Sequence, residues 1–127
     1  MPPEFLDIDM VVRAHLSLIE HYGGQGGLRD AGLLHSAIAM PQASFGGELL
    51  HNDLFTMAAA YLYHIVQNHP FIDGNKRTGA AAAIIFLDLN GVELEGDEDG
   101  LVELTLRVAA GQAGKQEVAE FFRRLAR

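Results

Sequence analysis

Residues 53–91 read DLFTMAAAYLYHIVQNHPFIDGNKRTGAAAAIIFLDLNG, two apolar segments separated by a polar stretch. Apolar residues recur at helical spacing over residues 53–68, and this segment begins with an aspartate, a favoured N-cap residue. Residues 75–89 are apolar on nearly every side, which predicts a central, buried helix. The stretch from His69 to Gly74 is therefore predicted to be a polar loop between two apolar helices.

The rest of the chain follows the same helical period. Four further helices are predicted, over residues 8–22, 30–40, 98–110 and 115–125. Glycine or proline separates most of them, a brief extended piece is expected at residues 92–94, and no strand pair is evident. The predicted fold class is all-α: a single compact domain, residues 1–127, of about six helices with a central buried helix.

Composition narrows the class of protein. A chain of 127 residues, 49% of them apolar, suits one folded domain rather than a disordered segment. The formal charge of −8 argues against a nucleic-acid partner, and the lack of cysteine excludes disulfides and thiolate chemistry. No apolar run approaches the roughly 20 residues of a membrane span, and no secretion signal is evident. We therefore expect a cytoplasmic protein with no membrane partner.

The loop before residues 75–89 has the features of a phosphate site. A helix N-terminus presents unpaired amide N–H groups and the positive end of its dipole. Gly74 precedes this helix and allows close approach of the backbone to a ligand, while Asn75 opens it and Lys76 and Arg77 add positive charge. The local chemistry predicts anion binding.

Asp73 and His69 complete a possible reaction centre. A carboxylate beside an anion site suggests Mg²⁺, which proteins bind through one or two carboxylates together with substrate phosphate oxygens. The His69 imidazole is a candidate general base for an incoming hydroxyl. Phe71 and Ile72 are expected to point into the core and fix the loop. Taken singly these residue types are ordinary in caps, turns and surfaces, but their occurrence within nine residues favours catalysis.

Other motifs do not fit the chain. The glycine and lysine order differs from a P-loop, and Arg77 and Ile84 occupy positions where a calcium loop needs ligands. No two histidines have the spacing of a helical zinc site. Structural or surface roles are expected for the other histidines, which are His15, His21, His35, His51 and His64. The glycine-rich segment 23–27 is interpreted either as a cover for the site or as a flexible connector.

The run from His69 to Arg77 resembles the motif of the Fic/Doc family, His-x-Phe-x-(Asp/Glu)-Gly-Asn-Gly-Arg-x-x-Arg. The matching residues are His69, Phe71, Asp73, Gly74, Asn75 and Arg77. Lys76 stands in place of the second glycine and Ala80 in place of the last arginine, and both departures are those of the death-on-curing (Doc) branch. Residues 22–24, 27–30, 32–34, 41–42 and 90–92 are also Doc-like, so the resemblance covers most of the chain.

This resemblance implies a helical toxin with phosphotransferase activity. It would use ATP and Mg²⁺ to phosphorylate a serine or threonine hydroxyl of a translation factor, with elongation factor Tu as the family's expected target. A Phd-type antitoxin is the expected partner, as an amphipathic helix laid in an apolar groove. The chain lacks the internal inhibitory segment of some Fic members, Ser/Thr-x-x-x-Glu-Gly/Asn, so control by a separate partner is expected.

The family roles transfer residue by residue. The resemblance implies His69, Lys76 and Arg77 as catalytic residues, Gly74, Asn75, Lys76 and Arg77 as the nucleotide-binding set, and Asp73 as the metal ligand. Lys76 is expected to crowd the pose used for AMP transfer, which favours transfer of the γ-phosphoryl group. The alternatives are an AMP-transferase of the Fic type, a non-catalytic Fic-fold module that only binds a partner, and a domain that binds nucleotide for regulation.

Overall fold

Helices dominate the computed structural model, which describes residues 2–127. In this part of the chain the elements are the helices α1 (Ile8–Tyr22), α2 (Ala31–Ala39), α3 (Leu54–Asn68), α4 (Asn75–Leu89), α5 (Glu98–Ala109) and α6 (Lys115–Leu125), a 3₁₀ turn (Met40–Gln42), and the strands β1 (Ser44–Phe45) and β2 (Glu48–Leu49). The predicted all-α class is confirmed. Each predicted helix end lies within one residue of the observed end.

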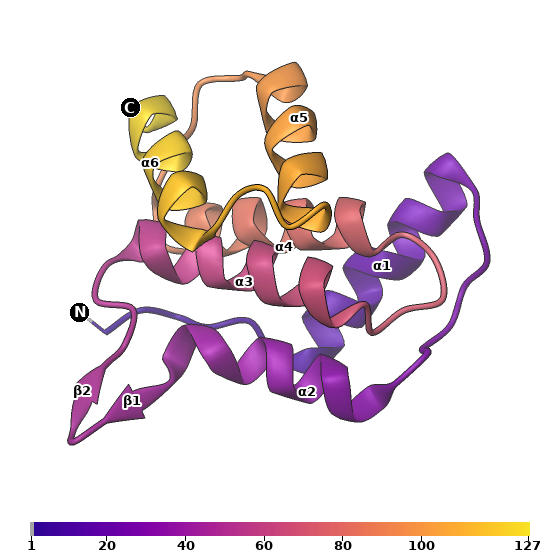
Figure 1. Cartoon of the computed structure of the whole chain (residues 1–127), viewed down its shortest axis with the longest axis horizontal. Helices are drawn as coiled ribbons and strands as arrows, with labels where there is room; N and C mark the ends of the chain where they lie inside the picture. Colours follow the sequence, from indigo (N-terminus) through magenta and orange to yellow (C-terminus); the bar gives the residue numbers. More distant parts are fainter. Residues whose placement is uncertain (1) are drawn as a thin grey trace.

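α3 lies at the centre of the molecule. It runs antiparallel to α4, with α5 and α6 on one side of this pair and α2 on the other (Figure 1). The residues of α3 from Met57 to Leu62 are almost fully buried, and they join buried residues of the other five helices in one apolar cluster. The central buried helix is thus α3, and the prediction of residues 75–89 for that place is wrong; the loop that follows α3 is anchored to the core.

α4 is buried on one side rather than all around. Ala82, Ala83 and Phe86 are fully buried, whereas Ile84 and Ile85 are 40% and 38% exposed. The helix packs mainly against α3 and α1, so its opposite face remains open. The alanine run therefore reflects close packing against α3, because small side chains let two helix backbones approach.

A short hairpin contradicts the expectation that the chain has no strand pair. β1 and β2 pair antiparallel, with Phe45 opposite Glu48, and project at the end of the molecule opposite the loop between α3 and α4 (Figure 1). Gly46 and Gly47 form the turn at φ 59° and 85°, the left-handed region that two-residue hairpin turns require. Strands of two residues are too short to show alternation in the sequence. The extended piece at residues 92–94 forms only an isolated bridge, between Leu94 and Ala126.

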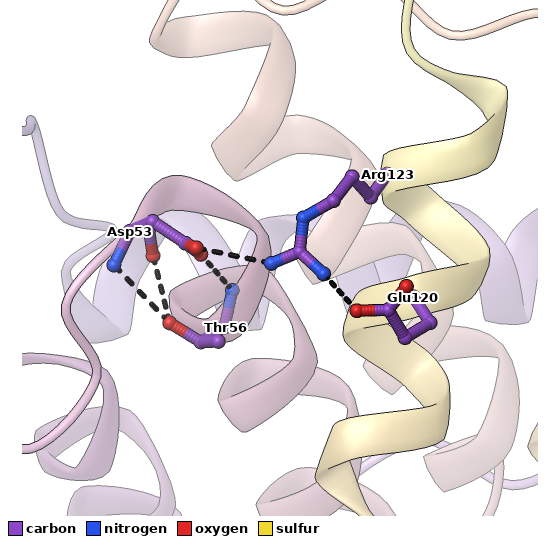
Figure 2. A network of polar contacts seen from close by, with 4 residues as sticks. All are labelled: Asp53, Thr56, Glu120 and Arg123. Atoms are coloured by element: carbon purple, nitrogen blue, oxygen red, sulfur yellow. Dashed lines mark hydrogen bonds and ion pairs between the residues drawn. The ribbon is translucent and has the colours of Figure 1, made fainter.

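The start of α3 is fixed by a polar network (Figure 2). Asp53 accepts a hydrogen bond from the Thr56 amide at 2.8 Å, and the Thr56 hydroxyl faces the Asp53 amide, which completes a capping box. Arg123 of α6 pairs with Asp53 at 3.0 Å and also with Glu120. Burial would raise the pKa of Asp53, but the Thr56 hydrogen bonds and the Arg123 guanidinium outweigh it, so the pKa lies below its ordinary value. The predicted N-cap is confirmed, and it also joins α3 to α6.

Within the described residues, no helix combines the length and apolar character needed to cross a membrane.

Candidate functional site

His69 ends α3 in an uncommon backbone conformation. Its φ and ψ are 52° and 55°, and it is the only non-glycine residue with positive φ among residues 2–127. The left-handed region costs an L-residue about 1–2 kcal/mol, so surrounding contacts must hold it. The His69 amide donates to the Ile65 carbonyl at 3.2 Å, and its side chain is exposed. The candidate base is therefore presented to solvent from a constrained turn.

Arg29 supplies much of that constraint, although sequence reasoning gave it no role. Its Nε donates to the His69 carbonyl at 2.7 Å, and its Nη2 donates to the Asn68 carbonyl at 2.9 Å. These carbonyls lie at the C-terminus of α3, where a cation is electrostatically favoured and unpaired acceptors need partners. The Arg29 and Asp30 amides also donate to the Pro70 carbonyl, at 2.7 and 3.0 Å. The only signal in the sequence was its place within a Doc-like stretch.

The glycine-rich segment covers one side of the loop. The Gly27 carbonyl accepts from the Ile72 amide at 3.0 Å, and Leu28 and Phe71 form an antiparallel bridge. The Gln25 amide donates to Asp73 Oδ2 at 2.8 Å. Of the two interpretations of this segment, the cover is the one the structure has, because its main chain is hydrogen-bonded to the site.

Asp73 is the candidate for the one carboxylate ligand of a cation whose other ligands come from water and substrate. Its side chain is exposed, with Oδ2 held by the Gln25 amide. Nowhere in residues 2–127 do three or more His, Cys, Asp or Glu side chains group to hold a metal by themselves. One oriented carboxylate beside a helix N-terminus fits Mg²⁺, which keeps water and substrate phosphates among its ligands.

The start of α4 is open to an anion. Gly74 is the N-cap, at φ 81°, and no side chain of the described chain caps the helix there. The Thr78 amide makes the first helical bond, to the Gly74 carbonyl at 2.9 Å. The amides of the first turn of α4, which precede Thr78, therefore receive no hydrogen bond from a side-chain cap. The positive end of the helix dipole lies beside them.

Asn75 braces the loop with its side chain. Oδ1 accepts from the Phe71 amide and Nδ2 donates to the Phe71 carbonyl, both at 2.9 Å, and Asn75 is buried. One donor and one acceptor of its side-chain amide are therefore used to hold the loop.

A pocket of about 380 Å³ brings most of the predicted residues together. It is lined by Val66, Gln67, His69, Ile72, Asp73, Gly74, Asn75, Lys76 and Ala109. Phe71 is buried as predicted, but the expectation that Ile72 points into the core is wrong, because Ile72 is exposed and lines the pocket. In an extended segment successive side chains point to opposite faces, so burying Phe71 turns Ile72 outward.

Arg77 lines a second pocket of about 390 Å³, which adjoins the first at the start of α4. Gly74, Asn75 and Lys76 line both pockets, and α5 closes the second with Leu101, Val102, Thr105 and Leu106. The Arg77 guanidinium lies 4.5 Å from the centre of the Tyr22 ring, a cation–π contact. His69 therefore lines the first pocket and Arg77 the second, and Lys76 lines both.

Comparison with known proteins agrees with this architecture. Residues 5–87 match the Fic/DOC family. The chain is 44% identical over 96 residues to "Toxin Doc" of Mycolicibacterium smegmatis (strain ATCC 700084 / mc(2)155), which covers 76% of this chain and 72% of that protein. It is 36% identical over 115 residues to "Protein kinase doc" of Escherichia phage P1, with 91% and 90% covered. With the motif from His69 to Arg77 inside the matched region and the helical fold around it, the chain belongs to the Fic/Doc family.

Proposed function

We propose that this protein is the toxin of a toxin–antitoxin pair and transfers the γ-phosphoryl group of ATP to a serine or threonine hydroxyl of a protein in the cytoplasm. The names of two relatives, a toxin and a protein kinase, support this proposal. The observation that carries it is the pocket shared by His69, Asp73 and the uncapped start of α4. A base, a metal-binding carboxylate and an anion site adjoin there, which is the set that phosphoryl transfer needs.

In the proposed reaction, the oxygen of the target hydroxyl bonds to the γ-phosphorus while the His69 imidazole accepts the hydroxyl proton. The bond from that phosphorus to the bridging oxygen breaks, and ADP leaves. The Lys76 ammonium and the α4 amides stabilise the charge on the phosphoryl oxygens. When bound beside Asp73, Mg²⁺ would neutralise phosphate charge.

Lys76 favours γ-phosphoryl transfer over AMP transfer. It replaces the glycine that AMP-transferring relatives use, and its side chain adjoins both pockets. A long cation there occupies space while offering charge to a transferring phosphoryl group. Arg77, which lines the second pocket, is proposed to pair with phosphates that remain on the nucleotide.

A Phd-type antitoxin is the proposed partner. Val102 and Leu106 of α5 are more than half exposed and form part of the wall of the second pocket. An amphipathic helix recognises such an apolar wall through residues spaced three and four apart. Its binding there would lie beside Lys76 and Arg77.

The proposal is tested with elongation factor Tu and ATP labelled at the γ- or the α-phosphate. Label should appear on the target only from the γ position. His69→Ala should lower transfer by about 10²-fold or more, as expected for loss of a general base. Asp73→Asn should raise the Mg²⁺ requirement, and His35→Ala, an exposed histidine of α2, should leave transfer unchanged.

Two outcomes would replace the proposal. Label from the α position alone identifies an AMP-transferase. Full toxicity of His69→Ala on expression in bacteria identifies a non-catalytic module that only binds a partner.

A further inference from the structure

A buried histidine of α1 contacts the loop between α3 and α4 from the side of the core. His15 is 1% exposed, and its Nε2 lies 2.8 Å from the Asp73 carbonyl oxygen. A carbonyl can only accept, so Nε2 carries the proton. The ring stacks on Phe71, with centroids 3.8 Å apart and planes 8° from parallel. A Cβ added at Gly74 would lie 3.5 Å from His15 Nε2 and Cδ2. One imidazole thus adjoins Phe71, Asp73 and Gly74 of the loop.

The hydrogen bond fixes the peptide between Asp73 and Gly74. A peptide unit is planar, so holding the Asp73 carbonyl also sets the direction of the Gly74 amide on the opposite side. Gly74 then opens α4 at positive φ. The orientation of this single peptide therefore decides where the α4 amides point relative to the Asp73 side chain.

Asp73 is held at both ends by different elements. His15 of α1 binds its main-chain carbonyl, and the Gln25 amide of the covering segment binds its carboxylate. If His15 were only a core filler, an aromatic ring of the same size would serve as well. The hydrogen bond to the residue that bears the candidate metal ligand is what distinguishes the two roles.

We propose that His15 is a positioning residue for phosphoryl transfer, holding the Asp73–Gly74 peptide so that the carboxylate and the α4 amides face one pocket. This inference rests on the proposed function. His15 touches no reacting atom, and it acts through the orientation of Asp73.

Two substitutions separate the hydrogen bond from the ring. His15→Phe keeps the stack on Phe71 and removes the donor, whereas His15→Gln keeps a donor of similar reach. His15→Phe should lower kcat about 10–100-fold and raise the Mg²⁺ concentration for half-maximal rate about tenfold, the usual effect of losing a group that orients a metal ligand. KM for the protein target should stay unchanged, and His15→Gln should recover most of the loss. His35→Phe is the matched surface control.

Binding tests the inference without turnover. Calorimetric titration with Mn²⁺·ATP should show weaker binding by His15→Phe. The Asp73→Asn variant should be equally weak with or without His15→Phe, because residues that act through one another are not additive. Nitrogen-15 NMR of the unsubstituted protein should find a proton on His15 Nε2.

Each arm has a contrary result. Unchanged Mn²⁺·ATP binding by His15→Phe, equal defects in folded His15→Phe and His15→Gln, or an Nε2 without its proton would each overturn the role of His15. If the unsubstituted protein transfers no phosphate to any target, the proposed reaction fails instead, and the binding and NMR results still decide the role of His15.

Discussion

The residues of the candidate site lie close together in the sequence, whereas the residues that position them do not. The motif residues lie within nine positions, so residue type and spacing were enough to suggest an anion site, a metal ligand and a base. The residues that position them are distant in the chain. His15, Gln25 and Arg29 reach the loop across 58, 48 and 40 residues respectively. A local pattern contains no information on contacts of that range.

The left-handed conformation of His69 was equally invisible, and it has a measurable consequence. Glycine populates positive φ freely, so His69→Gly should be more stable than His69→Ala by about 1 kcal/mol. At His35, an exposed helical position of α2, the order should reverse, with alanine more stable by about 1 kcal/mol. Urea unfolding of the four variants measures both differences. Alanine more stable than glycine at both positions would show that His69 is not strained.

At the scale of elements, helices were predicted well because an apolar face repeats many times in 9 to 15 residues. The hairpin was not predicted because each strand has only two residues. Its side chains are exposed, Phe45 at 82%, so there is no buried face that an apolar pattern could indicate. The packing of one helix on another was also not in the pattern. The sequence indicated that α4 was apolar, and the structure shows which face it buries.

Gly79 sets the closeness of α3 and α4. A Cβ there would lie 2.8 Å from Val66 Cγ2 and 3.0 Å from the Leu62 carbonyl oxygen. Gly79→Ala should lower the free energy of unfolding by about 1–3 kcal/mol, although alanine is the better helix former, because the backbone oxygen cannot move aside. Both helices flank the loop of residues 69–74, so the proposed transfer activity should fall together with stability.

Gly32 of α2 provides the matched substitution. It is exposed, and a Cβ there would lie 3.3 Å from a side-chain atom only, Asp30 Oδ1, which accepts from the Leu33 amide as the cap of α2. Gly32→Ala should lower the free energy of unfolding by no more than about 0.5 kcal/mol. If both alanine variants unfold at the same denaturant concentration, close packing at Gly79 is not a constraint on the fold.

At the scale of the whole molecule, a partly buried basic cluster joins the start of α6 to α3 and the residues just before it. Lys115 at the start of α6 lies 3.1 Å from His51 Nε2 and 3.0 Å from His64 Nε2, with the Tyr63 ring 5.7 Å from its ammonium. His51 precedes α3 and His64 lies within it. Burial, followed by the charge of Lys115, lowers the pKa of both histidines. The pKa of His64 falls to about 4, and His51 also contributes to this lowering. Both rings are therefore neutral acceptors for one lysine in the folded protein.

This cluster predicts that stability falls as the solution is acidified below about pH 6.5. In the unfolded chain a histidine takes up its proton near that pH, whereas folded His64 resists until about pH 4. Between these values the unfolded state binds more protons, so the free energy of unfolding decreases as pH falls and is fully retained above the window. Allowing for solvent screening, the loss should be about 1–2 kcal/mol. Asp53, whose pKa is lowered from 3.8, contributes only at more acidic pH.

Urea unfolding between pH 7.5 and 4.5 measures this dependence, and substitution assigns it. His64→Gln should flatten the curve because glutamine can still accept a hydrogen bond from Lys115 but does not titrate. His35→Gln, at an exposed site, should leave the slope intact. Parallel curves for the unsubstituted protein and His64→Gln would show that the cluster does not couple protonation to folding. Because Lys115 links α6 to α3, loss of this contact in acid should expose the α3–α6 interface before the loop of residues 69–74, which is held by α1 and the covering segment instead.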